Sequence, residues 1–195
     1  ITERLESQGI EVIYLDKRLG LDIPVVFRLA SLLRKRKIEV IHTHTDAIRY
    51  GVLAAVLAGV KKRVHTIHNM AAEETGELGS KLNFLFFKFF KTKPVALSGL
   101  VQESINKEYG IPKDQIPIAY NVMDLSKCLP KDNYSINREF IILNIARFFE
   151  QKNHIGLINA FNLFRKKYPN TKLWLIGDGP LKDETLLYVQ EAGLD

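Results

Sequence analysis

Apolar residues along this chain follow two spacings in turn, which predicts alternating strands and helices. Short apolar runs suit strands, and longer segments with an apolar residue at every third or fourth position suit helices. The opening residues 1–15 read as a helix end followed by a strand. Further strands are predicted at residues 38–43, 63–67, 94–97, 116–120, 140–145 and 172–176. Helices are predicted at residues 24–33, 46–58, 99–109 and 153–167, near residues 81–91, and from Pro180.

Repeated strand–helix units predict parallel sheets that are covered by helices on both faces. The pattern breaks at residues 124–139, a polar and irregular stretch that contains Pro130, and then restarts. We therefore predict two doubly wound α/β domains, at residues 1–125 and 139–195, joined by a linker at residues 126–138.

Residues at the predicted helix ends support these boundaries. Pro24 suits a first helical turn, and Thr45 or Asp46 could cap the helix that follows. Gly59 and Gly110 suit the left-handed residue that ends a helix. The early helices each have one apolar face, and the residues expected to point inward are Val25, Leu29, Leu32, Leu33, Ile48, Val52, Ala55 and Val56.

The composition indicates a globular protein that is not held together by disulfides. Hydrophobic residues make up 46% of the 195 residues, enough to bury a core. Cys128 is the only cysteine, which excludes an internal disulfide and suggests a reducing compartment. No apolar run is long enough to span a bilayer, and no signal peptide opens the sequence.

The charge balance favours an anionic partner. A net charge of +6 and a pI of about 9.3 suit nucleic acid, phospholipid head groups or a phosphorylated substrate. Two basic runs, residues 34–37 and 61–63, each lie between a predicted helix and a predicted strand. Cations are favourable at helix C-termini, so these runs also fit ordinary solvated helix ends.

Two cations follow the strand predicted at residues 140–145. Arg147 comes just after it, and Lys152 precedes a helix that Asn153 is expected to cap. Ligands of open α/β sheets bind beyond the carboxyl ends of the strands, and a helix N-terminus offers free N–H groups to an anion. Arg147 and Lys152 are therefore candidates for holding a phosphate. The alternative is ordinary surface charge beside a helix cap.

A glycine-rich turn, IGDGP at residues 176–180, lies between a predicted strand and helix. Gly177 and Gly179, with Asp178 between them, would let the backbone approach a ligand closely. A plain tight turn explains the same residues, and the segment is not the G-x-G-x-x-G dinucleotide fingerprint.

Four of the five histidines stand at the ends of two predicted strands, in HTH at residues 42–44 and HTIH at residues 65–68. His42 and His44 project to the same side of their strand, which would suit a metal. Apart from Asp46, no carboxylate or cysteine nearby completes a ligand set, so no metal is expected. Histidines bonded to backbone partners, or a His68 that contacts substrate, are the remaining interpretations.

The helix at residues 81–91 has more aromatic residues than one buried face requires. The expected core stripe consists of Leu82, Leu85, Phe86, Phe89 and Phe90. Phe84 and Phe87 fall off that stripe, close to Lys88. At about 16 Å the helix is too short to span a bilayer, but it could lie on an anionic membrane surface or receive a lipid-linked substrate. Packing against neighbouring loops is the alternative.

Taken together, these motifs resemble glycosyltransferase family 4, whose members have the GT-B fold of two facing Rossmann-like domains. The resemblance runs along essentially the whole chain. Its specific part is NIAR at residues 144–147 with QK at 151–152, followed by LIGDGP at 175–180. Its earlier landmarks are VIHTH at 40–44, TIHN at 66–69, ALS at 96–98 and IAYNVMD at 118–124.

The resemblance implies a retaining glycosyltransferase that moves a sugar from a nucleotide diphosphate donor to an acceptor hydroxyl, without a metal or other cofactor. Arg147 and Lys152 would hold the donor diphosphate and stabilise the departing phosphate. His68 would lie near the transferred sugar. The nucleotide pocket would be shaped by Gly177, Asp178 and Gly179.

The expected setting is the synthesis of a bacterial capsular, exo- or lipopolysaccharide on a lipid-linked or saccharide acceptor. The enzyme would work in the cytoplasm, at the inner face of the cell membrane, and would bind no nucleic acid. Phe84, Phe87 and Lys88 are the candidates for the acceptor or membrane side. The alternatives are a glucan synthase or sugar epimerase of the same fold, or a non-enzymatic module that binds polyanions through the basic runs.

The sequence departs from the family in four respects. Ala146 and Val122 each replace a usual glycine. The family's first strand with its glycine-rich loop, and its later E-x7-E element, have no counterpart in these residues. We therefore expect an internal fragment with both domains incomplete, and one that has little or no activity by itself.

Overall fold

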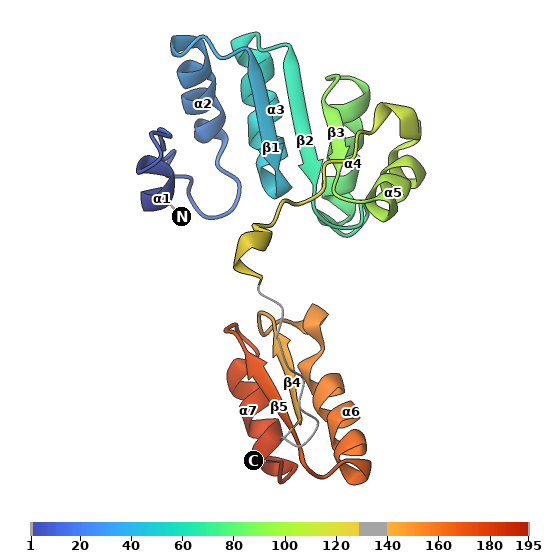
Figure 1. Cartoon of the computed structure of the whole chain (residues 1–195). Coiled ribbons are helices and arrows are strands. Elements are labelled where there is room, and N and C mark those ends of the chain that lie inside the picture. Colours follow the sequence, from blue (N-terminus) through green and yellow to red (C-terminus); the bar gives the residue numbers. More distant parts are fainter. Residues whose placement is uncertain (1, 129–139, 195) are drawn as a thin grey trace. The chain divides into compact units, whose positions relative to one another are not determined.

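The computed structural model describes residues 2–128 and 140–194, which form two compact units that divide after Leu125 (Figure 1). The linker predicted at residues 126–138 falls mainly on residues 129–139, which lie outside the described part of the chain. Each unit is described separately below.

The first unit is built on a parallel three-stranded sheet with its strands in sequence order (Figure 1). These strands are β1 (Val40–His44), β2 (Lys62–Ile67) and β3 (Lys93–Ala96). The register sets Thr43 opposite His65, and Thr66 opposite Val95. The carboxyl ends of all three strands therefore lie at one edge of the sheet.

The helices of the first unit connect and cover these strands. They are α1 (Thr2–Glu6), α2 (Ile23–Lys35), α3 (Ile48–Ala58), α4 (Gly76–Lys88) and α5 (Gly99–Tyr109), with short 3-10 turns at Thr45–Ala47, Lys113–Gln115 and Leu125–Lys127. Crossovers between parallel strands are right-handed, so strands in sequence order place α3 and α4 on the same face. Gly51 of α3 lies directly against the side chain of Thr43.

Side chains alternate between the two faces of a strand, so each strand presents one set of residues to the helices and another set to the opposite face. Thr43, His65 and Ile67 are buried under the helices, whereas His42 and His44 point to the other face and are exposed. A complete doubly wound sheet has helices on both faces, so helices on one face only are consistent with an incomplete sheet.

The core of the first unit consists of two clusters on the helix face. The larger one includes residues of α3, α4 and α5 and is made of Ile48, Val52, Ile67, Ala71, Phe86, Phe87, Ala96, Val101, Ile105, Tyr109 and Ile116. The smaller one lies between α2 and α3 and is made of Val26, Ala30, Leu33, Ala54, Ala55 and Val60. At about 25 cal/mol for each Å² of apolar surface removed from water, burial of this kind is what holds the layer of helices on the sheet.

Most of the predicted helix ends are confirmed. Pro24 lies in the first turn of α2, and Gly59 and Gly110 end α3 and α5 with φ angles of +79° and +65°. The predicted cap of α3 is wrong, since Thr45 and Asp46 lie in a 3-10 turn before the helix and Ala47 stands at the cap position.

Two predicted strands of the first unit are corrected. Residues 10–15 form no strand, and the last predicted strand is reduced to a single bridge between Ala96 and Ile118. Both segments have the apolar pattern of a strand, but a strand also needs a partner for its backbone groups. Val56, which was expected to point inward, is exposed on α3.

Helix α4 differs most from the sequence pattern. It begins at Gly76 rather than near Lys81, and Phe87, which was expected off the buried stripe, is only 7% exposed. The ring of Phe87 packs edge-on against Tyr109 of α5, with 5.1 Å between the ring centroids. Periodicity locates one buried side only, whereas α4 is covered both by the sheet and by α5. The buried side of α4 is the one that carries Phe87, so Leu82, Leu85 and Phe89, which were expected to be buried, are exposed instead.

The second unit has a parallel pair of strands, β4 (Phe140–Ile145) and β5 (Thr171–Ile176). Helix α6 (His154–Lys167) connects them, and α7 (Lys182–Glu191) follows β5. Asn153 caps α6 as predicted, because its side-chain oxygen accepts from the backbone N–H of Gly156 at 3.1 Å. Helix α7 begins two residues after the predicted start at Pro180.

Candidate functional site

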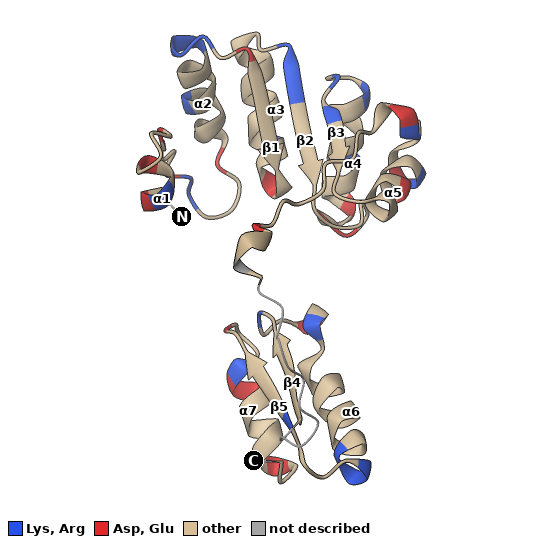
Figure 2. Ribbon diagram, in the orientation of Figure 1, with Lys and Arg blue, Asp and Glu red and all other residues tan. Residues whose placement is uncertain are grey.

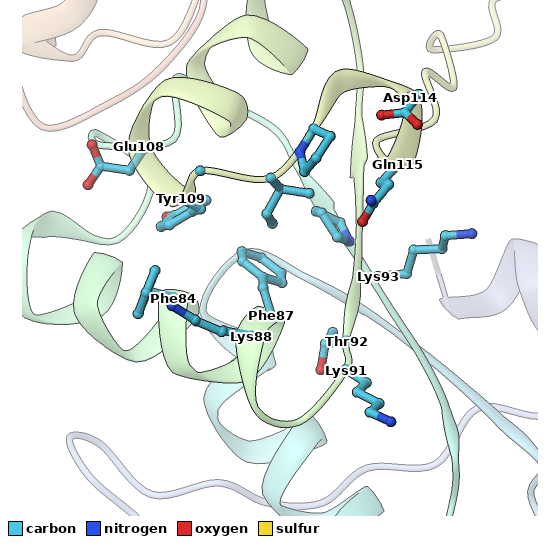
Figure 3. Close-up of a pocket in the computed structure, with 14 residues that line it drawn as sticks. Phe84, Phe87, Lys88, Lys91, Thr92, Lys93, Glu108, Tyr109, Asp114 and Gln115 are labelled. Carbon is cyan, nitrogen blue, oxygen red and sulfur yellow. The ribbon is translucent and has the colours of Figure 1, made fainter.

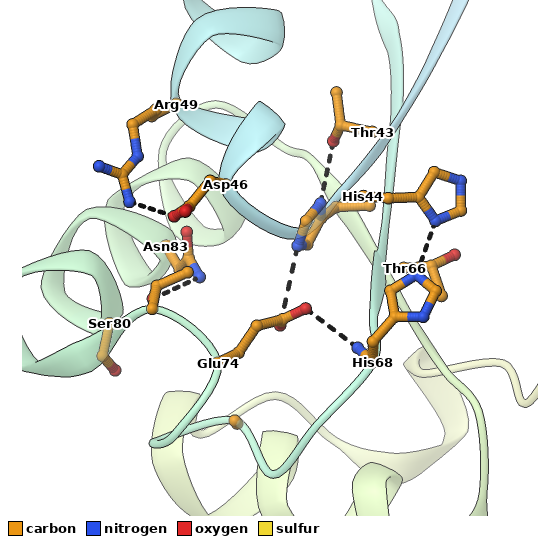
Figure 4. A network of polar contacts seen from close by, with 12 residues as sticks. Thr43, His44, Asp46, Arg49, Thr66, His68, Glu74, Ser80 and Asn83 are labelled. Atoms are coloured by element: carbon orange, nitrogen blue, oxygen red, sulfur yellow. Dashed lines mark hydrogen bonds and ion pairs between the residues drawn. The ribbon is translucent and has the colours of Figure 1, made fainter. Parts of the chain in front are cut away.

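Four histidines gather at the carboxyl edge of the first sheet. His42 and His44 belong to β1, His65 belongs to β2, and His68 follows β2 directly. His42, His44 and His68 are exposed, whereas His65 is buried under the helices. Figure 4 shows His44 and His68 close together. The parallel register of β1 and β2 produces this gathering, since it sets HTH of one strand beside HTIH of the next.

The exposed histidines bond to one another and to the neighbouring strand. Nδ1 of His44 lies 2.8 Å from Nε2 of His68, and Nε2 of His42 lies 2.8 Å from Oγ1 of Thr66. Partial burial, together with the neighbouring imidazole, lowers the pKa of His42 and of His44 below the ordinary histidine value. His42 and His44 are therefore neutral at pH 7.

His65 is completely buried and has one unpaired ring nitrogen. Its Nδ1 lies 2.9 Å from Oγ1 of Thr43, and that hydroxyl donates its hydrogen to the carbonyl of Val64 at 3.3 Å. The hydrogen in the Thr43–His65 contact therefore belongs to Nδ1, and Nε2 is left as an acceptor without a partner among the described residues. Burial lowers the pKa of His65 to about 4.

Glu74 is the residue of this site that sequence reasoning missed. Its Oε1 accepts a hydrogen bond from the backbone N–H of His68 at 3.0 Å, and its Oε2 lies 4.0 Å from Nε2 of His65 (Figure 4). The side chain is 1% exposed, and this burial raises the pKa of its carboxyl group. The available signal in the sequence is a carboxylate in the loop that follows the end of a strand.

The contact with Glu74 fixes the backbone at His68. This hydrogen bond gives the amide of His68 an acceptor at the start of an irregular loop. Glu74 thus acts on the loop rather than on a ligand. Within residues 2–128 and 140–194, no group of three or more His, Cys, Asp or Glu side chains is placed to hold a metal ion.

In the second unit, Arg147 and Lys152 both follow the carboxyl end of β4. Figure 2 shows basic residues in blue on the segment between β4 and α6. Both side chains are exposed. The guanidinium carbon of Arg147 stands 4.2 Å from the centroid of the Phe149 ring, and Lys152 ends a 3-10 turn, Glu150–Lys152, just before the cap of α6. The two cations therefore stand on either side of a short loop that leads into a helix N-terminus.

The IGDGP turn packs directly against this loop. The backbone N–H of Ala146 donates to Ile176, and that of Phe148 donates to the carbonyl of Asp178 at 2.9 Å. The side chain of Asp178 accepts from the N–H of Gly179 and lies 3.8 Å from Nζ of Lys182. Gly177 and Gly179 have φ angles of +152° and +154°, which only glycine adopts without strain.

The predicted site residues thus fall into three places. His68 lies at the carboxyl edge of the first sheet, and Arg147, Lys152, Gly177, Asp178 and Gly179 lie together at the carboxyl edge of the second. Phe84, Phe87 and Lys88 belong to the last turns of α4, at the amino edge of the first sheet, so they do not share a site with His68.

Comparison with known proteins identifies the family. The model of Glycosyltransferase Family 4 matches residues 2–127, and the model named Glycosyl transferases group 1 matches residues 129–195. The first match covers more than half of the chain. The chain belongs to glycosyltransferase family 4.

Several curated glycosyltransferases align with most of the chain. A UDP-Gal:alpha-D-GlcNAc-diphosphoundecaprenol alpha-1,3-galactosyltransferase of Escherichia coli is 28% identical over 84% of this chain and 46% of its own length. An alpha-monoglucosyldiacylglycerol synthase of Acholeplasma laidlawii is 27% identical over 80% of the chain and 46% of its own length. The chain spans about half the length of the curated relatives it matches.

A solved structure confirms the fold class. Alr3699/HepE of Anabaena, crystallised in complex with UDP and glucose, superposes with a TM-score of 0.77 at 18% identity, over 100% of this chain and 56% of its own. The prediction of a GT-B-like α/β protein with parallel, incomplete sheets in two units is confirmed for this family 4 member.

Proposed function

We propose that this family 4 protein is a retaining glycosyltransferase that moves a sugar from a nucleoside diphosphate to an acceptor hydroxyl. In this reaction the bond between the anomeric carbon of the sugar and the diphosphate oxygen breaks, and the acceptor oxygen takes the place of the diphosphate. The leaving diphosphate gains negative charge as the bond breaks. The observation that carries the proposal is the pair of exposed cations, Arg147 and Lys152, before the N-terminus of α6.

Arg147 and Lys152 supply the charge that such a leaving group requires. A close contact between a cation and a phosphate is worth roughly 4 kcal/mol of Coulomb energy at an effective dielectric near 20, before desolvation is counted. The partial positive charge of the α6 N-terminus adds to this attraction. Because positive charge at the departing phosphate favours the transition state over the ground state, these groups would supply the main catalytic contribution, without a metal.

The turn formed by Gly177, Asp178 and Gly179 supports the same location for the donor. Its backbone hydrogen bonds hold it beside Arg147, at the edge where ligands of α/β sheets bind. His68 of the first unit is proposed to hydrogen-bond the transferred sugar, and Glu74 would position it through its backbone N–H.

The acceptor is proposed to be a lipid-linked saccharide or a glycolipid in a bacterial surface polysaccharide pathway. Support comes from the names of relatives, which include a diphosphoundecaprenol galactosyltransferase, a diacylglycerol glycolipid synthase and CapH, a capsular polysaccharide biosynthesis glycosyltransferase of Staphylococcus aureus, 21% identical over 91% of this chain and 50% of its own length. With such an acceptor, we propose that the reaction takes place at the inner face of the cell membrane.

Contact with the membrane surface is proposed to involve α4. An exposed apolar stripe runs along this helix and consists of Leu78, Leu82, Leu85 and Phe89. Lys81 and Lys88 are exposed on the same helix, which suits an anionic lipid surface. No helix in the described part of the chain is both long enough and apolar enough to cross a bilayer.

Calorimetric titration with UDP, GDP and their sugar conjugates tests the donor site. We expect Arg147→Ala and Lys152→Ala each to weaken diphosphate binding by about tenfold or more, equivalent to about 1.4 kcal/mol. Lys167→Ala is the matched control, because it removes a cation from the opposite end of α6 and should leave binding unchanged. Normal nucleotide binding by both Arg147→Ala and Lys152→Ala would show that the phosphate role is wrong.

A further inference from the structure

A pocket lies at the amino edge of the first sheet, away from the residues proposed for sugar transfer. It has a volume of about 910 Å³ and is formed by the last turns of α4, the start of β3 and the segment from the end of α5 to Gln115 (Figure 3). Volumes of this size are typical of pockets that hold small molecules. The strands of the first sheet are parallel, so this edge is opposite the one that carries His68.

The walls of the pocket are apolar and aromatic. They include the rings of Phe84, Phe87 and Tyr109 and the side chain of Ile111. Phe84 and Ile111 are partly buried and pack against the core, so the apolar surface continues from the core to the mouth of the pocket. A hydrocarbon chain would gain by leaving water for such a surface.

Three lysines surround these walls. Lys88, Lys91 and Lys93 come from three consecutive parts of the chain, namely the end of α4, the following turn and the start of β3. Figure 3 shows Lys88 beside Phe84, and Lys91 and Lys93 on the other side of Phe87 with their side chains extending away from that ring. All three are exposed, and among the described residues none of them forms an ion pair. Nζ of Lys88 stands 5.0 Å from the centroid of the Phe84 ring.

The negative groups near the pocket are occupied or lie at its margin. Oε1 of Glu108 accepts from Oγ of Ser80 at 2.5 Å, and Figure 3 shows this carboxylate directed away from the Phe87 ring. Asp114 stands on the rim beside Gln115. Just after α4, the carbonyl of Phe90 accepts a hydrogen bond from Nε of Arg63 at 2.9 Å, so this carbonyl is not free to repel an anion.

One polar group at the pocket has no partner. Thr92 lies between Lys91 and Lys93, is only 2% exposed and lines the pocket, yet its hydroxyl makes no hydrogen bond within the described residues. Buried hydroxyl groups are nearly always paired, because an unpaired one loses its hydrogen bonds to water without replacement. A ligand oxygen held between the lysines would give this hydroxyl an acceptor.

We propose that this pocket binds one phosphate-headed amphiphile. The phosphate lies among Lys88, Lys91 and Lys93, with the Thr92 hydroxyl as an additional donor, and the hydrocarbon chain lies on Phe84, Phe87, Tyr109 and Ile111. The same chemistry is present in an anionic membrane phospholipid and in a free alkyl or prenyl phosphate. The site is separate from the donor site and does not depend on the proposed transfer reaction.

Dodecyl phosphate below its micelle concentration is a suitable probe, since it combines both halves of the expected ligand. A Phe84→Trp substitution in a Trp174→Phe background places the single tryptophan of the chain in the pocket wall, and its emission should shift to the blue as the alkyl chain binds. We expect saturable binding of one molecule. Inorganic phosphate and dodecyl maltoside, which each lack one half, should bind at least about tenfold more weakly.

The combined substitution Lys88→Gln, Lys91→Gln and Lys93→Gln should weaken dodecyl phosphate binding by at least about tenfold. The matched control removes three exposed cations from the last turn of α6, as Arg165→Gln, Lys166→Gln and Lys167→Gln, and should keep full affinity. Both proteins should bind UDP like the parent chain, so a failure of this site is distinct from a failure of the donor site.

Vesicles identify the source of the amphiphile. Displacement of bound dodecyl phosphate by phosphatidylglycerol vesicles, but not by phosphatidylcholine vesicles, would identify a membrane phospholipid. Bound dodecyl phosphate that phosphatidylglycerol vesicles do not displace would identify a free alkyl phosphate. Equal affinity of the pocket variant and its control for dodecyl phosphate, or inorganic phosphate binding as tightly as dodecyl phosphate, would overturn the proposal.

Discussion

Gly177 lies so close to Ala146 that a Cβ atom on Gly177 would stand 1.9 Å from the carbonyl oxygen of Ala146. Two residues further on, a Cβ on Gly179 would stand 2.5 Å from the carbonyl oxygen of Phe148. Both neighbours are backbone atoms, which cannot rotate away as a flexible side chain can. The IGDGP turn and the Arg147 loop therefore depend on each other for their shape.

Gly177→Ala should destabilise the second unit by about 3 kcal/mol or more, because it adds a clash to an unfavourable φ angle. Trp174, which lies on β5 only three residues away, provides the fluorescence signal for a urea titration. Gly193→Ala is the control: Gly193 also has a positive φ, of +62°, but nothing lies within 4 Å of its added Cβ, so about 1 kcal/mol is expected. Similar losses in the two variants would show that the close approach to Ala146 is unimportant.

Glu74→Ala should release the backbone amide of His68. The lost hydrogen bond to a carboxylate corresponds to about tenfold faster hydrogen exchange at this amide, or about 1.4 kcal/mol. Exchange followed by NMR or mass spectrometry measures the effect. Glu74→Gln retains an oxygen acceptor and should largely preserve protection, so equal exchange rates in the Ala and Gln variants would contradict the positioning role.

The buried imidazole of His65 should make stability depend on pH. Above pH 6.5 the folded and unfolded chains both hold a neutral His65. Between pH 6.5 and about 4, the unfolded chain takes up a proton that the folded chain refuses, so the free energy of unfolding falls by up to about 3 kcal/mol. The raised pKa of Glu74 acts in the opposite direction, since the folded chain then binds that proton more readily.

NMR titration of the histidine Hε1 resonances measures this directly. We expect a midpoint of about 4 for His65, and midpoints below 6.5 for His42 and His44. A midpoint near 6.5 for His65 would mean that its ring is hydrated, contrary to its complete burial.

The fold was largely predictable because strong local signals mark it. Glycines at the ends of α3 and α5, the Asn153 cap and the apolar run 140–145 each specify a boundary by themselves. The errors concern segments whose state depends on partners. Residues 10–15 have the pattern of a strand but form none, and the pattern of α4 cannot reveal that α5 covers Phe87.

Leu82, Leu85 and Phe89 should contribute to membrane binding rather than to stability, because all three are exposed on α4. Replacing them together by Gln should reduce sedimentation with phosphatidylglycerol vesicles by about tenfold or more. The matched control replaces three exposed leucines of the second unit, Leu163, Leu186 and Leu187, by Gln. An equal loss of sedimentation in both proteins would show that the α4 stripe has no special role.

The candidate site was predictable from the sequence only where its residues directly follow the end of a predicted strand. Arg147, Lys152 and the IGDGP turn follow the ends of two adjacent strands, so a rule for strand ends was enough to group them. Glu74 could not be found in that way, because its contact with His68 depends on how an irregular loop folds back. The pocket beside Lys88, Lys91 and Lys93 was hidden for a related reason, since it is formed by elements that meet at the opposite edge of the sheet.

The ring contact between His44 and His68 has a consequence for how a ligand is recognised. The two rings are 2.8 Å apart, and in the form in which both are neutral they share one hydrogen, so one ring must donate and the other must accept. If His44 donates from Nδ1, His68 carries its own hydrogen on Nδ1 and offers a donor. If His68 donates from Nε2, its Nδ1 is a lone pair and offers an acceptor. The tautomer of His44, one strand away, thus determines whether His68 gives a hydrogen bond to a sugar hydroxyl or receives one.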